Sequence, residues 1–276
     1  MKAVSDTKSI RQFDIQDLLR IMERLRDPSD GCPWDKKQTL TSVIPHTLEE
    51  CYELVDAIEQ GDLPHVAEEL GDVLFQVIFY SELGRELGAF DFNAVVDGIA
   101  RKLLRRHPHV FADGAIEGRV LTSITTEEVK VNWESIKRKE RGPQNSLGSL
   151  GDVPRALPAL SRAQKLQKRA ATVGFDWQDI DSVVEKLEEE LSEFQQAASQ
   201  SSKEGMAEEL GDLIFSAVNV ARHLEFDAEK LLRRANEKFE ARFNHMETAA
   251  LAEGSSLKEE STAQMEARWQ SAKTKD

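Results

Sequence analysis

Two sets of four acidic residues recur in the chain with the same internal spacing. In each set an ExxE pair is followed, after the same step, by an ExxD pair that ends the hexapeptide AEELGD. The first set is Glu50, Glu53, Glu69 and Asp72, and the second is Glu190, Glu193, Glu209 and Asp212. A repeat of this kind indicates internal duplication of one acidic module.

The spacing predicts that the four acids of each set converge. Residues three apart lie on one face of a helix, so each pair places two carboxylates in a row. A short polar connection at Gly61, Asp62 and Pro64 makes the two helices of the first set antiparallel neighbours, with both rows facing one groove. Like charges this close repel by roughly 4 kcal/mol per pair at the effective dielectric of a protein surface. A bound cation is therefore expected.

The ligand type indicates which cation. Carboxylates alone, without thiolate or imidazole at ligand spacing, favour Mg²⁺, or Mn²⁺, over zinc. The alternative is a solvated acidic helix face. It is disfavoured because Asp72 is followed by VLFQVIFY and Asp212 by LIFSAVNV, which are apolar nearly all round and predict packed helices. One small bundle would not readily cover segments 73–80 and 213–220, so we also expect a homodimer.

Helical periodicity dominates the whole chain. Apolar residues recurring every three or four positions predict helices near 15–25, 46–60, 64–88, 92–107, 126–141, 158–172, 180–200, 203–224, 227–252 and 259–273. No convincing strand alternation is present. The predicted fold is all-α, with two helical-bundle modules at 1–141 and 155–276 joined by a linker at 142–154 that is rich in glycine, proline and serine.

Charge and cysteine content limit the classes of partner. The net charge of -14 gives the long-range field the wrong sign for nucleic acid or an anionic membrane, so neither is expected as a partner. Cys32 and Cys51 form no CxxC motif, and no apolar run has the length of a membrane span or a secretory signal. The expected location is the cytoplasm.

Cationic residues recur downstream of each acidic set. When ARKLLRRH from Ala100 is laid over NEKFEARF from Asn236, the matched cations are Lys102 with Lys238 and Arg106 with Arg242. We predict that both pairs contact phosphate, although surface charges that balance an acidic protein are the alternative. The overlay also exposes a difference, since the amide of Asn236 can hydrogen-bond a base or a sugar and the methyl of Ala100 cannot. This difference predicts that the C-terminal module is the working one.

The ordered combination of motifs resembles the MazG family of all-α nucleoside triphosphate pyrophosphohydrolases. The likeness covers nearly the whole chain, including both acidic repeats, GCPWD at 31–35, RRHPHVF at 105–111 and GFDW at 174–177. It implies Mg²⁺-dependent hydrolysis of a nucleoside triphosphate between its α and β phosphates, which gives a monophosphate and pyrophosphate. It also implies a dimeric bundle in which partner helices help to complete each site.

The predicted roles follow from the residues and this resemblance together. All eight acids are candidate metal ligands; the catalytic set is Glu190, Glu193, Glu209, Asp212 and Lys238; the substrate-binding set is Lys238, Arg242, Asn236, Trp269, Lys102 and Arg106. Packing is the alternative for Trp269. Trp34 and Trp177, which precede the acidic helices, are expected to anchor the core rather than stack on a base.

Several alternatives remain open at this stage. The acid that accepts a proton from water, the number of metal ions and the preferred base and sugar are not fixed by spacing. A non-catalytic module that binds a nucleotide or a protein is the rival function. A hydrolase of signalling nucleotides with a different leaving group is the third possible function.

Overall fold

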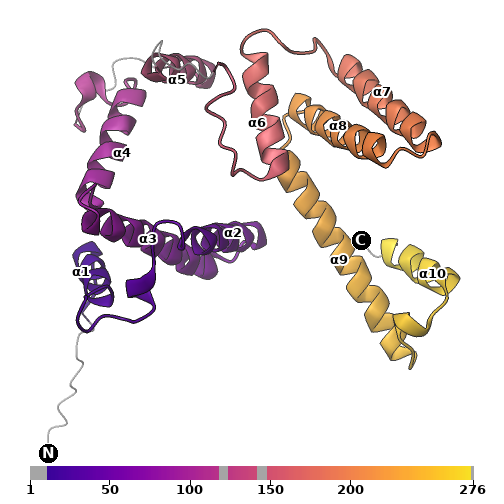
Figure 1. The fold of residues 1–276 in the computed structure, drawn as a ribbon, viewed down its shortest axis with the longest axis horizontal. Coiled ribbons are helices and arrows are strands. Elements are labelled where there is room, and N and C mark those ends of the chain that lie inside the picture. Colours follow the sequence, from indigo (N-terminus) through magenta and orange to yellow (C-terminus); the bar gives the residue numbers. More distant parts are fainter. Residues whose placement is uncertain (1–10, 118–123, 142–147, 275–276) are drawn as a thin grey trace, which may run out of the picture. The chain divides into compact units, whose positions relative to one another are not determined.

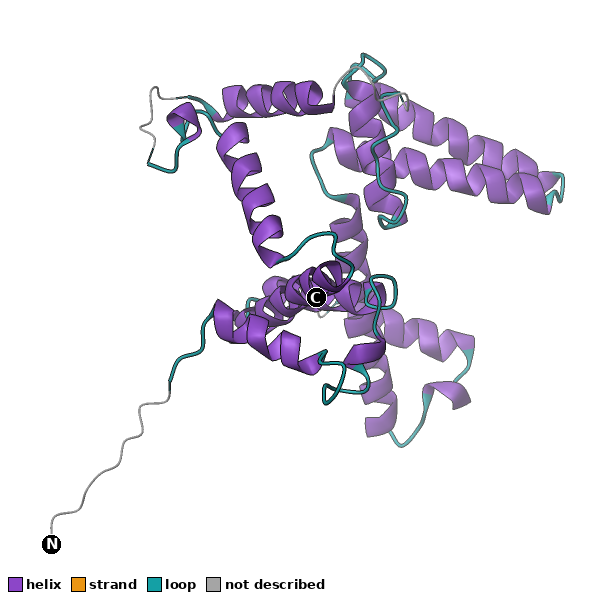
Figure 2. Cartoon of the chain, turned by 60° about the vertical axis from the view of Figure 1, so that its left-hand side comes forward, coloured by secondary structure: helices purple, strands orange, loops and turns teal. Residues whose placement is uncertain are grey.

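The computed structural model describes residues 11–117, 124–141 and 148–274, and over these residues it contains helices and turns without a strand (Figure 2). The predicted all-α class is confirmed. The chain divides into two compact units, Met1–Glu140 and Arg141–Asp276. Residues 142–147 of the expected linker lie outside the described residues.

The helices follow the predicted order (Figure 1). The first unit holds α1 (Ile15–Leu25), η1 (Asp35–Lys37), α2 (Ile44–Gln60), α3 (Leu63–Glu86), α4 (Phe92–Arg106), η2 (Ala112–Gly114) and α5 (Thr126–Arg141). The second holds α6 (Ala159–Ala171), α7 (Ile180–Ser199), α8 (Lys203–His223), α9 (Ala228–Ala252), η3 (Leu257–Glu259) and α10 (Thr262–Lys273). The last helix begins later than predicted, because Ser261 and Gln264 form a capping box that fixes its start.

The α2/α3 hairpin of the first unit is set by its turn. Gly61 ends α2 in the left-handed conformation at φ 75°, which glycine adopts without strain. Asp62 then caps α3 by accepting a hydrogen bond from the backbone N–H of His65. The two helices therefore run antiparallel and pack along their length, as do α7 and α8 in the second unit.

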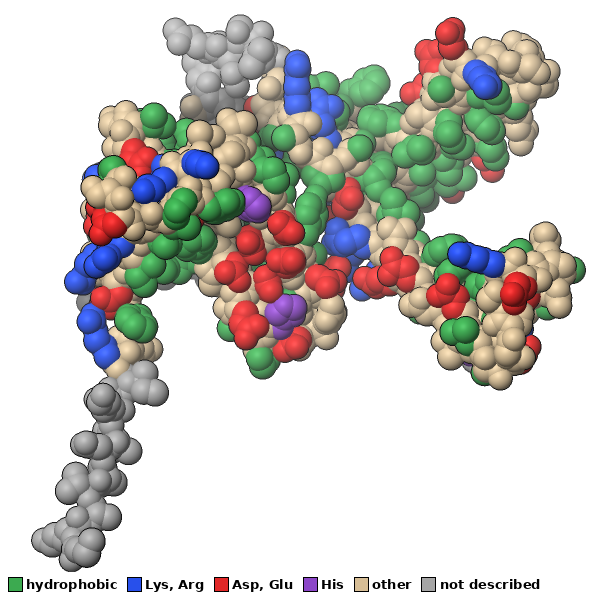
Figure 3. Space-filling model, turned by 60° about the horizontal axis from the view of Figure 1, so that its bottom comes forward, with side chains coloured by type: hydrophobic (Ala, Val, Ile, Leu, Met, Phe, Trp, Pro, Cys, Tyr) green, Lys and Arg blue, Asp and Glu red, His purple; other side chains and the backbone are tan. Residues whose placement is uncertain are grey.

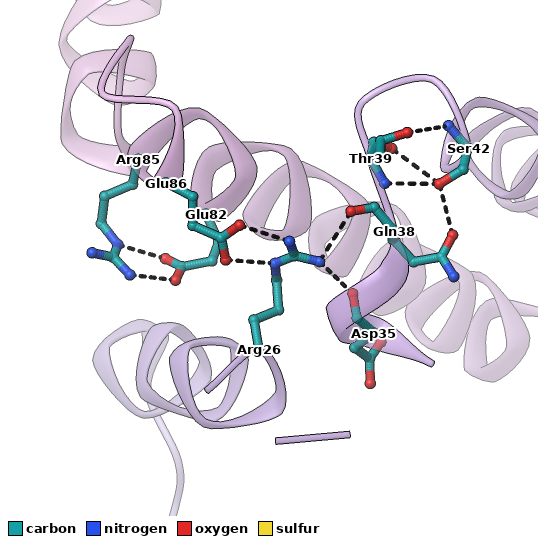
Figure 4. Close-up of polar contacts among 8 residues, drawn as sticks. All are labelled: Arg26, Asp35, Gln38, Thr39, Ser42, Glu82, Arg85 and Glu86. Carbon is teal, nitrogen blue, oxygen red and sulfur yellow. Dashed lines mark hydrogen bonds and ion pairs between the residues drawn. The ribbon is translucent and has the colours of Figure 1, made fainter. Parts of the chain in front are cut away.

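A buried arginine fixes the segment that leads into α2 (Figure 4). The Arg26 guanidinium lies at 2.7 Å from each carboxylate oxygen of Glu86 and also donates to the backbone carbonyl of Asp35. It is 7% exposed and lies over the Phe79 ring. Because these contacts join α1, η1 and α3, they hold the segment after Cys32 against the core formed by Met22, Val43, Ile78, Phe79 and Leu83.

The prediction that Trp34 anchors the core is wrong. Its side chain is 52% exposed and meets the His46 ring edge-on, with ring centroids 5.5 Å apart. The η1 segment is held to the core by Arg26, which donates to the Asp35 carbonyl and pairs with Glu86, and not by the indole. Trp177 is half-buried and packs against Phe175.

In the second unit the GFDW turn is tied to the end of α8. Asp176 pairs with the Arg222 guanidinium and lies 3.1 Å from Nε2 of His223, and these contacts hold the pKa of Asp176 below its usual value. The amide of Gln164 donates to the Phe226 carbonyl at 2.6 Å and accepts from the Ala228 N–H at 3.1 Å. These polar contacts hold the segment before α7 against the end of α8 and tie the turn between α8 and α9 to α6.

In the described ranges no helix combines the length and the apolar character that crossing a bilayer requires.

Candidate metal centre and nucleotide site

The α2/α3 hairpin brings the acids of the first set together. Glu50 of α2 and Glu69 and Asp72 of α3 each offer an oxygen, and these oxygens all lie within 4.8 Å of one another. Glu53 is close enough for its charge to act on Glu50. Figure 3 shows acidic side chains gathered with a histidine on one face of the molecule.

The second hairpin forms a similar cluster in which one member differs. Glu190 and Glu193 of α7 and Glu209 of α8 also place oxygens within 4.8 Å of one another. The charge of Asp212 reaches Glu209. Six of the eight predicted acids therefore form two clusters, one in each unit, while Glu53 and Asp212 lie outside the 4.8 Å groups and act on them through their charge.

Both clusters have the electrostatics of a cation site. Burial, followed by the charges of Asp72, Glu53 and Glu69, raises the pKa of Glu50. The pKa of Glu209 is raised in the same way, by burial and then by Glu193, Asp212 and Glu190. Glu69 is 8% exposed, and its Oε2 is buried without a hydrogen-bond partner. A divalent ion with oxygen preference fits this donor set, because it satisfies the orphaned oxygen and offsets the repulsion.

Each cluster also contains a nitrogen-bearing side chain, close to one of its acids, that sequence reasoning missed. In the second unit, Lys186 Nζ lies 2.9 Å from Oε1 of Glu190 and 3.0 Å from Oε2 of Glu189, and these contacts raise the pKa of Lys186. In the first unit, His65 Nε2 lies 2.8 Å from Oε1 of Glu69. The sequence spacing could have predicted these contacts, since Lys186 and His65 each lie four residues before the glutamate that they contact on the same helix.

The raised pKa of Glu50 makes a prediction about stability. Its folded-state pKa lies above the usual 4.5, so its contribution to stability is present below that pH and is lost as pH rises through the folded-state value. At pH 8 in chelator, Glu50→Gln should therefore raise the Tm, by about 2 °C. In saturating Mg²⁺ wild type should have the higher Tm, because the ion stabilises only the chain that retains its ligand.

Differential scanning calorimetry at pH 4 and pH 8 checks this prediction. The Tm difference should vanish near pH 4, where the Glu50 carboxyl is protonated. Glu68→Gln, an exposed change on α3, is the control. A variant that is less stable than wild type in chelator at pH 8 contradicts the assignment.

The predicted phosphate-binding cations lie on helices that leave the hairpins. In the second unit α9 packs against α10 and α6, while α7 packs against α8 (Figure 1). Asn236 and Lys238 are exposed on α9. Arg242 lies over the Trp269 ring at 5.6 Å, and Phe239 contacts the same ring at a centroid distance of 5.4 Å. Arg242, Trp269 and Phe239 thus form one surface of α9 and α10.

The first unit contains an equivalent pair that was only half predicted. Arg106 lies over the ring of Trp133 at 5.5 Å, and it also pairs with Glu140 of α5. Lys102 is exposed on α4. His107 and His109 lie in the turn after α4, as expected, and the His107 ring contacts Trp133. Trp133 was missed, although the overlay that matches Arg106 with Arg242 also matches Trp133 with Trp269.

Comparison with known proteins identifies the class. The model of the MazG nucleotide pyrophosphohydrolase domain matches residues 38–111 and again residues 178–247, which are the two segments that carry the acidic clusters. The chain therefore belongs to the MazG family, with two tandem modules, and the predicted class of enzyme is confirmed.

Two full-length relatives agree with this assignment. The chain is 48% identical over 264 residues to the nucleoside triphosphate pyrophosphohydrolase of Escherichia coli strain K12, covering 95% of this chain and 98% of the relative. It is 42% identical over 261 residues to the nucleoside triphosphate pyrophosphohydrolase/pyrophosphatase MazG of Thermotoga maritima, covering 95% and 96%. A crystal structure of a mazG-related protein from Thermotoga maritima aligns with 45% of this chain and 99% of its own, at 25% identity and a TM-score of 0.37.

Proposed function

We propose that this chain hydrolyses nucleoside triphosphates between the α and β phosphates, to a nucleoside monophosphate and pyrophosphate, with Mg²⁺ as cofactor. The convergence of three carboxylate oxygens within 4.8 Å in each hairpin carries the proposal. The names of the two full-length relatives support the reaction class. Clean-up or control of the nucleotide pool is the role that suits such a reaction.

The acids of each cluster would hold Mg²⁺, with Mn²⁺ as a substitute. When bound, such an ion neutralises phosphate charge and polarises the phosphorus centre. A carboxylate that is not fully engaged as a ligand accepts the proton of the attacking water. Lys186 sits on the edge of the cluster, where its ammonium can move from Glu190 to a phosphate oxygen. Lys238 and Arg242 bind the remaining phosphate charge.

We assign most of the activity to the second unit. Asn236 is exposed there and can bind a base or a sugar, whereas the matching position in the first unit is Ala100. The position of Lys186 is taken in the first unit by His46, which lies 3.7 Å from Glu49. The first unit therefore lacks two groups that a triphosphate can use.

A homodimer would complete the site. In a single chain several apolar side chains of the hairpins remain exposed to solvent, with exposed fractions of 39% for Leu74, 49% for Ile214 and 42% for Phe215. Phe239 on α9 is 55% exposed. A second copy that covers these faces would bring its α9, with Lys238 and Arg242, toward an acidic cluster. Sedimentation equilibrium at micromolar concentration should give twice the mass of one chain, and a strictly monomeric species contradicts this arrangement.

The net charge bears on the kind of partner, and the proposed substrate bears on the location. The net charge of -14 supports a small-molecule substrate rather than a nucleic acid, because only a local cationic surface can meet an anion. We place the enzyme in the cytoplasm, where nucleoside triphosphates are found.

Product analysis tests the proposed function. Ion-exchange chromatography after incubation with a panel of canonical and damaged triphosphates in Mg²⁺ should show monophosphate and pyrophosphate in equal amounts. Diphosphate plus phosphate indicates the alternative leaving group. No product from any triphosphate favours the non-catalytic binding module.

A further inference from the structure

The two acidic clusters differ in the nitrogen group that contacts one of their acids. In the first unit, Nε2 of His65 lies 2.8 Å from Oε1 of Glu69, which belongs to the second helix of its hairpin. In the second unit, Nζ of Lys186 lies 2.9 Å from Oε1 of Glu190, which belongs to the first helix of its hairpin. The nitrogen group therefore contacts opposite helices of the hairpin in the two units.

Neither nitrogen group recurs in the other repeat. The position that matches His65 is Gly205, which has no side chain, and the position that matches Lys186 is His46. Within the described residues, Glu50 and Glu209 have no side-chain nitrogen at ion-pair distance, and burial and the neighbouring acids raise the pKa of both carboxyls. Each cluster therefore keeps its unbalanced negative charge on a different helix.

The two nitrogen groups also differ in charge. An imidazole that carries one proton is neutral and can donate through Nε2–H, whereas an ammonium carries a full positive charge. Glu190 and Glu189 raise the pKa of Lys186, so its ammonium is charged at neutral pH. The second-unit cluster thus already holds a cation against Glu190, a carboxylate that is buried. A metal ion that uses this carboxylate as a ligand has to displace the ammonium.

In the first unit the contact leaves one carboxylate oxygen available to a metal ion. His65 contacts Oε1 of Glu69, while Oε2 is buried without a hydrogen-bond partner. Hydrogen bonds that orient a metal ligand raise metal affinity by about ten- to a hundredfold. His65 is therefore a positioning residue for Glu69, and as a neutral donor it adds no charge that a metal ion has to displace.

We propose that the first-unit cluster holds a divalent ion in the absence of nucleotide, whereas Lys186 keeps the second-unit cluster a weak metal site until a triphosphate arrives with its own ion. This inference rests on the proposed function, which makes the second unit the site of hydrolysis. Phosphate oxygens accept charge-assisted hydrogen bonds from an ammonium as carboxylates do, so a triphosphate can take Lys186 from Glu190 and free that ligand. The second-unit ion then enters with each substrate, while the first-unit ion stays bound between turnovers.

Mn²⁺ binding to each cluster alone tests this difference. Glu190→Gln with Glu209→Gln leaves the first-unit cluster, and Glu50→Gln with Glu69→Gln leaves the second. Electron paramagnetic resonance at pH 8 without nucleotide should show an affinity at the first cluster at least about tenfold above that at the second. Adding His65→Ala should remove most of this advantage, and His65→Gln, whose amide retains a donor, should preserve it. Circular dichroism checks that each variant keeps its helices.

Lys186→Gln should have effects of opposite sign in the chain that retains only the second cluster. Binding of Mn²⁺ alone should strengthen by about tenfold, because one fewer positive charge opposes the ion. Binding of a preformed complex of Mn²⁺ with an α,β-methylene triphosphate analogue, measured by isothermal titration calorimetry, should weaken by a similar factor, because the phosphates lose an ammonium partner. A residue that only supports the fold would lower both affinities.

The first unit supplies the matched control. His46→Lys places an ammonium at the position that matches Lys186 and should weaken Mn²⁺ binding there, whereas His46→Gln should not. Equal Mn²⁺ affinities at the two clusters, or no change in Lys186→Gln, overturn the inference, and the proposed function still stands if the preformed complex binds. A chain that binds neither Mn²⁺ nor the complex overturns both.

Discussion

Glu193→Gln is expected to lower kcat for triphosphate hydrolysis by about a thousandfold, which corresponds to roughly 4 kcal/mol of lost transition-state stabilisation. Glu193 lies in the second-unit cluster, within 4.8 Å of oxygens of Glu190 and Glu209. The amide keeps the shape of the side chain but removes the charge that holds a hard cation. Because Glu193 is exposed, its replacement should leave folding intact. Pyrophosphate release under saturating substrate measures the effect.

The duplicated chain supplies a matched control. Glu53 holds the equivalent position in the first unit, and Glu53→Gln should keep activity near that of wild type. The comparison is sharp because both variants lose one exposed carboxylate from equivalent helices. Loss of activity in Glu53→Gln with activity spared in Glu193→Gln would reverse the assignment of the working unit.

Removal of divalent metal should have an equally large effect. Four clustered acids repel a triphosphate, so the metal-free enzyme should lose turnover entirely in excess chelator rather than retain a reduced rate. Adding Mg²⁺ or Mn²⁺ beyond the chelator should restore it, while Ca²⁺ is the comparison ion with looser geometry. A continuous assay of pyrophosphate release measures both the loss of turnover in chelator and its recovery when metal is added. Full activity in chelator contradicts the proposed chemistry.

The helices and the clusters were predictable from sequence because both depend on local spacing. The bounds of α2, α3, α7 and α8 follow from apolar periodicity and from caps such as Asp62. The convergence of Glu50 with Glu69 follows from three-residue spacing on two helices joined by a short turn. Equal steps in both repeats predicted a similar cluster in the second unit, where Glu193 takes part in place of the acid that corresponds to Asp72.

Other features depend on contacts that spacing does not encode. Trp34 is exposed, whereas the buried side chain next to η1 is that of Arg26, which is held by Glu86 of α3. The capture of Arg106 by Glu140 joins α4 to α5 across a long connection. An amphipathic pattern predicts that a helix has a covered face, but not which neighbour covers it. This is why the course of α4 and α9 away from the hairpins was not foreseen.

Mn²⁺ binding followed by electron paramagnetic resonance tests whether the clustered acids hold a metal ion, because free and bound Mn²⁺ give distinct signals. Wild type should take up Mn²⁺ at both clusters, and addition of a non-hydrolysable triphosphate should change the bound spectrum. Glu190→Gln with Glu193→Gln should lose the second-unit ion and the response to nucleotide. If wild type leaves all Mn²⁺ free at millimolar concentration, with or without nucleotide, the acidic clusters are not metal sites.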